Sequence, residues 1–220
     1  KAKFFLKRNE RKVKFLKFEE SCLKNLQKYT NYENLVIPNI IFYIEVNNVE
    51  LLLMEWITMD NYDQQKLGIG LGEMHIESNK FNPKSFGYPM HGYIGTTNQI
   101  LGWEKNWIKC FINLRIEPQL EILEKDFIEI DIKKKIKSKI ESELYDHEPI
   151  NSLVHGDLWS GNIGVNQMNK GVIFDPACWW ADCEVDIAMT KLFGKFRSEF
   201  YENYHQIIPL KKGHEKRTII

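Results

Sequence analysis

The chain has no long apolar run and no excess of charge of either sign. Apolar runs such as residues 51–54 have only the length of a strand, whereas a membrane-spanning helix needs about 20 residues. Thirty basic side chains balance thirty acidic ones, so no net field favours nucleic acid or an acidic membrane surface. We therefore expect a soluble protein with no nucleic-acid partner and no membrane partner.

Cysteine is also scarce. The four cysteines, at positions 22, 110, 178 and 183, have neither the paired spacing of a zinc site nor the density of a disulfide scaffold. A reducing compartment is the simplest interpretation, so we expect a cytoplasmic protein, and we expect it to be a monomer. With 43% hydrophobic residues over 220 positions, the chain can bury a sizeable core.

What the chain does have is a set of polar residues at fixed spacing, His155-Gly-Asp157 followed by Asn162 and then by Asp175. Protein kinases place a catalytic Asp five residues before a metal-binding Asn, and a second metal-binding Asp follows on the next strand. The spacing predicts that Asp157 is a catalytic base and that Asn162 and Asp175 hold Mg²⁺. We expect His155 to orient this loop by hydrogen bonding.

The segment between Asn162 and Asp175 predicts a hairpin, because a turn signal at residues 169–171 precedes an apolar, β-branched run. Either aspartate alone could be an ordinary turn residue beside Gly or Pro. Their combination with the asparagine spacing favours the catalytic interpretation. Mg²⁺ prefers few carboxylates together with phosphate oxygens, which suits one Asn and one Asp.

The residues around this motif carry a family resemblance. The resemblance extends over residues 155–162, 175–177 and 184–194, and over a mid-chain pattern that comprises Tyr93-Ile-Gly-Thr, Trp103, Trp107, Arg115 and Gln119. In these stretches the chain resembles the fructosamine (ketosamine) kinase family, a branch of the aminoglycoside-phosphotransferase-like kinases. The resemblance implies an α+β, protein-kinase-like fold of two lobes. A small β-rich N-terminal lobe, incomplete here, would precede a larger and mainly helical C-terminal lobe.

The family's activity is ATP- and Mg²⁺-dependent phosphorylation of the sugar of ketosamines, such as fructosamine or ribulosamine, free or protein-linked, in protein deglycation. Two alternatives stay open. The protein could phosphorylate another small molecule, such as an aminoglycoside or a choline-like alcohol. It could also be an inactive nucleotide-binding remnant, because no glycine-rich loop precedes the strand lysine and the sequence starts at Lys1 without a Met. The sequence looks like an internal portion of a longer protein.

Residues 1–57 would form the N-terminal lobe and residues 58–220 the C-terminal one. We expect a strand over residues 4–7, a helix over residues 13–26, and strands over residues 36–44 and 51–54. The resemblance implies that Lys7 binds the nucleotide phosphates and is held by Glu19, although the sequence does not firmly separate Glu19 from Glu20. A hinge of Glu55, Trp56 and Ile57 would receive adenine through its backbone.

In the C-terminal lobe, apolar periodicity predicts helices over residues 64–75, 103–123, 128–144 and 187–193. Trp103 and Trp107 would then lie on one helical face in the core. Trp179 and Trp180 stand where the family more often has tyrosines. These two indoles could stack on a sugar in the substrate pocket or could simply close the cleft. Asp186 could cap the last helix or contact the substrate.

Overall fold

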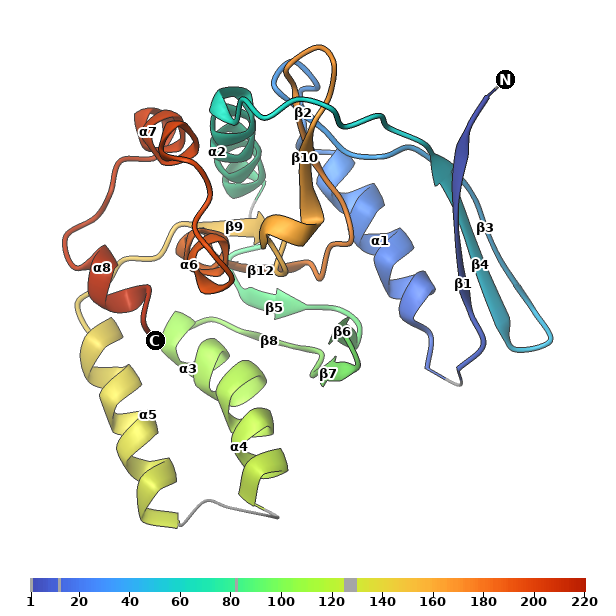
Figure 1. Cartoon of the computed structure of the whole chain (residues 1–220). Coiled ribbons are helices and arrows are strands. Elements are labelled where there is room, and N and C mark those ends of the chain that lie inside the picture. Colours follow the sequence, from blue (N-terminus) through green and yellow to red (C-terminus); the bar gives the residue numbers. More distant parts are fainter. Residues whose placement is uncertain (1, 12, 82, 125–129) are drawn as a thin grey trace.

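A computed structural model describes residues 2–11, 13–81, 83–124 and 130–220 of the chain (Figure 1). A small antiparallel sheet with one helix against it forms one side of the molecule. The other side is larger and carries most of the helices around short strands. The expected α+β plan, with a small β-rich part and a larger mainly helical part, is confirmed.

The small sheet has the strand order β1-β4-β3, and all of its pairs are antiparallel. Its strands are β1 (Phe4–Asn9), β3 (Ile40–Val46) and β4 (Val49–Glu55). On β4, Glu50, Leu52 and Met54 are buried while their neighbours are partly exposed, as expected for a strand with one covered face. The covering element is α1 (Phe15–Gln27), which buries one of its own faces against the sheet.

One expected strand is split in two. Residues 36–44 were predicted as a single strand, but the structure has β2 (Leu35–Val36) and β3, with Pro38 between them. Proline has no backbone N–H and cannot donate to a ladder, which explains the break. β2 instead pairs in parallel with β11 (Gly171–Ile173), so this early segment joins a sheet of the larger part.

The larger part contains two more sheets and a hairpin. β11 pairs antiparallel with β10 (Ile163–Val165), so the hairpin predicted between Asn162 and Asp175 is confirmed. A four-stranded sheet has the order β8-β5-β12-β9, and a separate hairpin pairs β6 with β7. These strands are β5 (Phe86–Tyr88), β6 (Gly92–Ile94), β7 (Thr97–Gln99), β8 (Gly102–Glu104), β9 (Asn151–Val154) and β12 (Trp179–Asp182).

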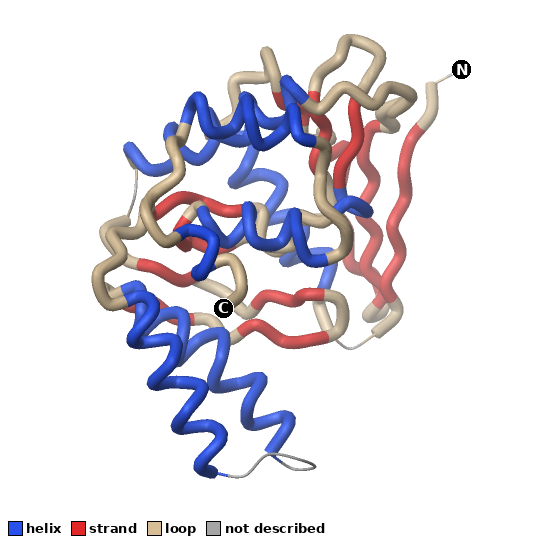
Figure 2. Tube along the Cα trace, turned by 60° about the vertical axis from the view of Figure 1, so that its left-hand side comes forward, coloured by secondary structure: helices blue, strands red, loops and turns tan. Residues whose placement is uncertain are grey.

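Helices surround these strands. They are α2 (Gln65–Lys80), α3 (Trp107–Phe111), α4 (Glu117–Glu124), α5 (Ile130–Leu144), α6 (Glu184–Leu192), α7 (Ser198–Ile207) and α8 (His214–Arg217). A π-helical turn, Ile112–Ile116, joins α3 to α4. A 3₁₀ turn, Ser160–Asn162, ends the loop of residues 155–162, which we call the catalytic-type loop. In both views α4 and α5 extend together away from the rest of the molecule (Figures 1 and 2).

The helix predicted from Trp103 begins later, so that expectation is wrong. Trp103 lies in β8 and is 43% exposed, whereas Trp107 opens α3 and is buried. The side chain of Asn106 accepts a hydrogen bond from the Lys109 amide, which caps the helix and sets its start. The two tryptophans therefore share no helical face. The predicted start of the next helix, residue 128, lies outside the described residues.

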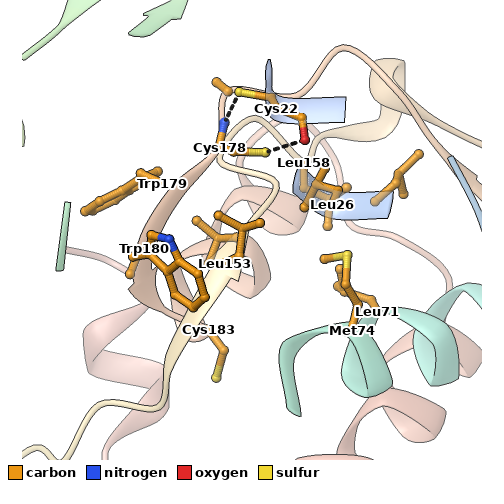
Figure 3. Packing of buried hydrophobic residues seen from close by; sticks show 14 of the residues in the cluster. Cys22, Leu26, Leu71, Met74, Leu153, Leu158, Cys178, Trp179, Trp180 and Cys183 are labelled. Atoms are coloured by element: carbon orange, nitrogen blue, oxygen red, sulfur yellow. Dashed lines mark hydrogen bonds between the residues drawn. The ribbon is translucent and has the colours of Figure 1, made fainter. Parts of the chain in front are cut away.

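The core brings α1 and α2 against β9 and β12. In Figure 3, Leu26 of α1 and Leu71 and Met74 of α2 face Leu153 of β9. The Cys178 amide also donates to Cys22 Sγ at 3.2 Å. All four cysteines are buried free thiols, as expected for a chain without a disulfide framework. Among the described residues, no helix is both long enough and apolar enough to span a membrane.

Helix α2 carries Gly68, although glycine is a poor helix former. A Cβ on this glycine would lie 2.2 Å from the backbone oxygen of Phe200, so α7 approaches α2 too closely for any side chain there. Tertiary packing therefore overrides helix propensity at this position.

We expect Gly68→Ala to destabilise the protein by about 1–3 kcal/mol, because the overpacking of α2 against α7 exceeds the gain in helix propensity. Urea denaturation measures the change, and Gln65→Ala, at an exposed position of the same helix, is the control. A stabilised Gly68→Ala variant would contradict the close approach of the two helices.

Candidate active site

A lysine and two acidic side chains meet where the small sheet faces the larger part. Lys7 of β1 places Nζ 2.8 and 2.9 Å from the two carboxylate oxygens of Glu19 on α1. The same Nζ lies 2.5 Å from Asp175 Oδ1. Burial lowers the pKa of Lys7, but the two carboxylates outweigh this effect and hold its pKa above the ordinary value. The lysine is therefore a fixed cation.

The neighbouring Glu20, which the sequence did not separate from Glu19, points elsewhere and pairs with Lys17 and Lys24 on its own helix. The structure thus assigns the lysine partner to Glu19. One turn of helix lies between this glutamate and the start of α1, so the placement of that start controls the pair.

The start of α1 is held by a residue that the sequence interpretation missed. Glu50 of β4 has a fully buried carboxylate, which accepts hydrogen bonds from the Leu16 and Lys17 amides of the first turn of α1. Asn9 of β1 and the hydroxyl of Tyr43 on β3 donate to it as well. Because an anion at a helix N-terminus satisfies free N–H groups and the helix dipole, Glu50 anchors α1 to all three strands.

The loop after β9 carries the other candidate residues. Asn162 donates from its Nδ2 to the backbone oxygen of Asp157 at 2.8 Å and to its Oδ2 at 3.0 Å. Burial raises the pKa of Asp157 above its ordinary value, although the carboxyl is only half buried. The Phe174 amide donates to the Asn162 carbonyl at 3.1 Å, which ties this loop to the segment that carries Asp175.

His155 is buried and holds the loop from inside. Its Nδ1 accepts from the Asp157 amide at 3.3 Å, so the ring hydrogen lies on Nε2, which donates to the Phe174 carbonyl at 2.9 Å. Burial lowers the pKa of His155, consistent with a neutral ring in this geometry. The histidine thus joins the loop of Asp157 to the segment that precedes Asp175.

Asp186 has neither of the two roles considered for it from the sequence. Its carboxylate is fully buried and accepts hydrogen bonds from the His155 amide at 2.7 Å and the Gly156 amide at 2.8 Å. His75 Nε2 lies 3.1 Å away, and the other ring nitrogen contacts the Tyr204 hydroxyl. Burial alone would raise the pKa of Asp186, but the bonds from His75 and Gly156 outweigh it and lower the pKa.

Position 156 accepts only glycine, because neither its backbone conformation nor the space around it allows a side chain. Its φ of +81° lies in the left-handed region, and a Cβ would meet the Ala177 carbonyl at 2.1 Å. The loop therefore turns sharply between the buried His155 and the more accessible Asp157.

An apolar slot opens beside the Lys7 group. It encloses about 170 Å³ and is lined mainly by Phe5, Met54, Trp56, Ile57, Met59 and Phe174, with Asp175 at its edge. All three predicted hinge residues thus line a cavity whose chemistry suits a flat, mostly apolar ring. Glu55 also borders the slot, but its amide already donates to the Asn39 carbonyl at 3.0 Å, which leaves backbone donation to a ligand to Trp56 and Ile57.

The two tryptophans considered for the substrate pocket lie in the core. Trp179 and Trp180 belong to β12 and are 4% and 9% exposed. Trp179 stacks on Trp107 with a centroid distance of 5.7 Å, and the Arg115 guanidinium lies 4.0 Å over its ring. Trp180 packs edge-on against Tyr29. Because both indoles already have protein partners, neither offers a face to a sugar in this structure.

The donor set fits a divalent cation near Asn162 and Asp175. The side-chain nitrogen of Asn162 donates its hydrogen bonds to Asp157. This orients the amide so that its oxygen can act as a metal ligand. Oxygen donors from one amide and one carboxylate suit Mg²⁺, which takes its remaining ligands from phosphate and water. A second cluster of possible metal ligands, formed by His147, Asp182 and Glu184, lies elsewhere. Its Glu184 is already paired with Arg217.

The fold and this site together define the class of protein. In protein-kinase-like proteins, a lysine of a small antiparallel sheet pairs with a glutamate of the adjacent helix and faces a loop with an Asp and an Asn five residues apart. This chain has the same arrangement. Similarity to solved structures agrees. An aminoglycoside phosphotransferase mutant superposes with a TM-score of 0.54 at 12% identity, over 85% of this chain and 64% of that one, which shows the fold alone.

The chain belongs to the fructosamine kinase family, whose model matches residues 1–220. A probable ketoamine kinase of Vibrio parahaemolyticus is 32% identical over 99% of this chain and 75% of that protein. The ketosamine-3-kinase of Mus musculus is 30% identical over 76% of this chain and 62% of that protein. A solved putative fructosamine-3-kinase from Haemophilus somnus has a TM-score of 0.85 at 27% identity, over 98% of this chain and 72% of that one.

We expect Asp186→Asn to loosen the catalytic-type loop. One amide NH₂ would face the donated N–H groups of His155 and Gly156, and a buried donor without an acceptor costs on the order of 1–3 kcal/mol. Thermal or urea unfolding measures the loss, with the exposed Asp146→Asn as a matched control. Equal stability of both variants would show that the Asp186 charge does not hold the loop.

Proposed function

We propose that the protein is an ATP-dependent kinase that phosphorylates the sugar moiety of ketosamines. The observation that carries this proposal is the single cluster in which Lys7 Nζ bonds both Glu19 and Asp175 while Asn162 bonds Asp157. Membership of the fructosamine kinase family supports it, as do the names of its relatives, a probable ketoamine kinase from a bacterium and the ketosamine-3-kinase of mouse. Such an enzyme is a phosphotransferase with an alcohol acceptor, and its role would be protein deglycation.

In this proposal Asp157 accepts the proton of the attacking sugar hydroxyl. Its carboxylate is held by Asn162 and only half buried, so it is both oriented and reachable. Lys7, kept cationic by two carboxylates, binds the nucleotide phosphates and offsets their charge. His155 and Asp186 do not touch the substrate but hold the loop backbone in place.

The nucleotide would enter the apolar slot. Trp56 and Ile57 would meet adenine with their backbone, Phe5 and Phe174 would cover its faces, and the phosphates would extend toward Lys7. Asn162 and Asp175 would hold Mg²⁺, which would neutralise phosphate charge and orient the transferred group. Complexes of an aminoglycoside phosphotransferase with AMP-PNP and ADP support nucleotide use by this fold.

We propose further that residues 1–57 act as the nucleotide-binding lobe and residues 58–220 as the catalytic and substrate lobe. The end of β4 at Glu55 and the start of α2 at Gln65 support this boundary. We also propose a cytoplasmic monomer whose partner is a small or protein-linked ketosamine. Buried free thiols at all four cysteines support a reducing compartment.

The first test is transfer of phosphate from Mg-ATP to a fructosamine or ribulosamine. We expect Asp157→Asn to lower kcat by about 10²–10⁴, the range for a lost general base, because an amide cannot take the hydroxyl proton. Nucleotide affinity should stay near that of the wild type. Coupled ATP-consumption assays and calorimetric titration of Mg-ADP measure the two quantities.

The exposed Asp146→Asn serves again as the control and should retain full activity. A wild type active only on aminoglycosides or choline-like alcohols would move the substrate assignment within the wider group. A wild type that binds nucleotide and transfers phosphate to none of these would support the inactive alternative.

The rate should also report the titration of Asp157. The ionised form is the base, and burial raises its pKa, so kcat/KM should fall with acidification through an apparent pKa above the ordinary Asp value of about 3.9. Burial lowers the pKa of His155, so its ring is neutral at neutral pH. A pH–rate profile with saturating Mg²⁺ measures this; an activity unchanged down to about pH 4 would contradict it.

A further inference from the structure

Helix α1 contacts two parts of the protein at once. Glu50 fixes its first turn from the small sheet. On its other side lies the segment from β5 to β6, which belongs to the larger part and folds back as the β6–β7 hairpin (Figure 1). Because α1 carries Glu19, whatever fixes the helix also fixes the partner of Lys7.

The contact between hairpin and helix is aromatic and tight. Tyr93 of β6 packs edge-on against two rings of α1. The ring centroids are 4.7 Å apart for Phe15 and 6.2 Å apart for Phe18. Tyr88 of β5 meets Phe18 edge-on at 5.9 Å. Its hydroxyl also accepts a hydrogen bond from Asn25 at 2.7 Å, two turns further along α1. These contacts leave only 3% of Phe18 exposed to solvent.

Gly92 leaves the space that Phe18 fills. A Cβ at Gly92 would lie 2.6 Å from Cζ of Phe18, and no real Cβ contact is that short. The φ of Gly92 is not in the left-handed region, so its backbone would accept another residue. The glycine is therefore needed for the ring of Phe18 rather than for a turn.

Phe18 and Glu19 are consecutive, so a shift of one moves the other. The two bonds from Lys7 Nζ to Glu19, at 2.8 and 2.9 Å, tolerate a displacement of only a few tenths of an ångström before they weaken. We propose that the β6–β7 hairpin, through Gly92 and Tyr93 acting on Phe18, positions Glu19 and thereby sets the affinity of the Lys7 site for nucleotide phosphates.

This inference rests on the proposed nucleotide role of Lys7, but it assigns positioning residues outside that site. It makes the larger part responsible for the state of the lysine–glutamate pair. By linkage, a hairpin that affects nucleotide affinity must itself be stabilised when nucleotide binds.

The test is Gly92→Ala. The added methyl group should push Phe18 and α1, and the affinity for Mg-ADP should fall about tenfold, the factor that corresponds to loss of one charged hydrogen bond. Isothermal titration calorimetry measures the affinity. Phe18→Leu shortens the side chain at the contact. The double variant Gly92→Ala with Phe18→Leu should therefore recover most of the affinity for Mg-ADP.

Two further readouts separate positioning from simple packing. Amide hydrogen exchange should be faster over α1 in Gly92→Ala without any ligand, and Mg-ADP should slow exchange over residues 92–99 in the wild type. Asn98→Ala, an exposed change in β7, should alter neither exchange over α1 nor nucleotide affinity. If Gly92→Ala does not fold, Tyr93→Leu removes the ring edges instead and should weaken Mg-ADP binding.

A variant with a lower unfolding midpoint but wild-type nucleotide affinity would overturn the proposal, as would a double variant that does not recover. Failure of the proposed function gives a different pattern, because exchange and nucleotide binding respond to Gly92 even when no ketosamine is phosphorylated. If the wild type binds no Mg-ADP, the proposed function fails, and unchanged exchange over α1 in Gly92→Ala would then overturn the positioning role independently.

Discussion

The buried carboxylate of Asp186 is the interaction on which the catalytic-type loop depends. It accepts two backbone N–H groups from the loop and contacts His75, which in turn reaches Tyr204 on α7. An ionised carboxylate with no access to water is stable only when several donors surround it. This requirement joins the loop to α2 through His75 and to α7 through Tyr204, so the packing of these helices fixes the position of the loop.

A second constraint couples the small sheet to the larger part of the protein. Lys7 comes from β1, Glu19 from α1 and Asp175 from the segment after β11, so the cluster exists only when all three elements are placed together. Glu50 holds α1 from the sheet, and the β5–β6 segment holds it from the other side. Nucleotide binding and phosphoryl transfer would therefore be sensitive to packing well away from the reacting atoms.

Much of the site could be predicted because its polar residues lie at characteristic distances from one another along the sequence. Asp157, Asn162 and Asp175 are read from one loop and one hairpin, and the hairpin formed as expected. Where prediction failed, the apolar pattern had been followed without the nonlocal strand pairing and without the local cap and proline signals that interrupt it. Trp103 fits an apolar helical pattern, yet pairing of β8 with β5 and the Asn106 cap begin the helix at Trp107. Pro38 split a strand that apolar composition alone suggested was continuous.

By itself the sequence determined the family, the first helix and several later ones, and the spacing of the residues in the catalytic-type loop, since these depend on neighbours along the chain. Only the tertiary structure decided that Glu19 rather than Glu20 meets Lys7, and that Trp179 and Trp180 are buried. It alone revealed that Asp186 and Glu50 are anchors. The physical reason is that a buried charge is defined by donors from distant segments, and no local pattern records which segments will meet.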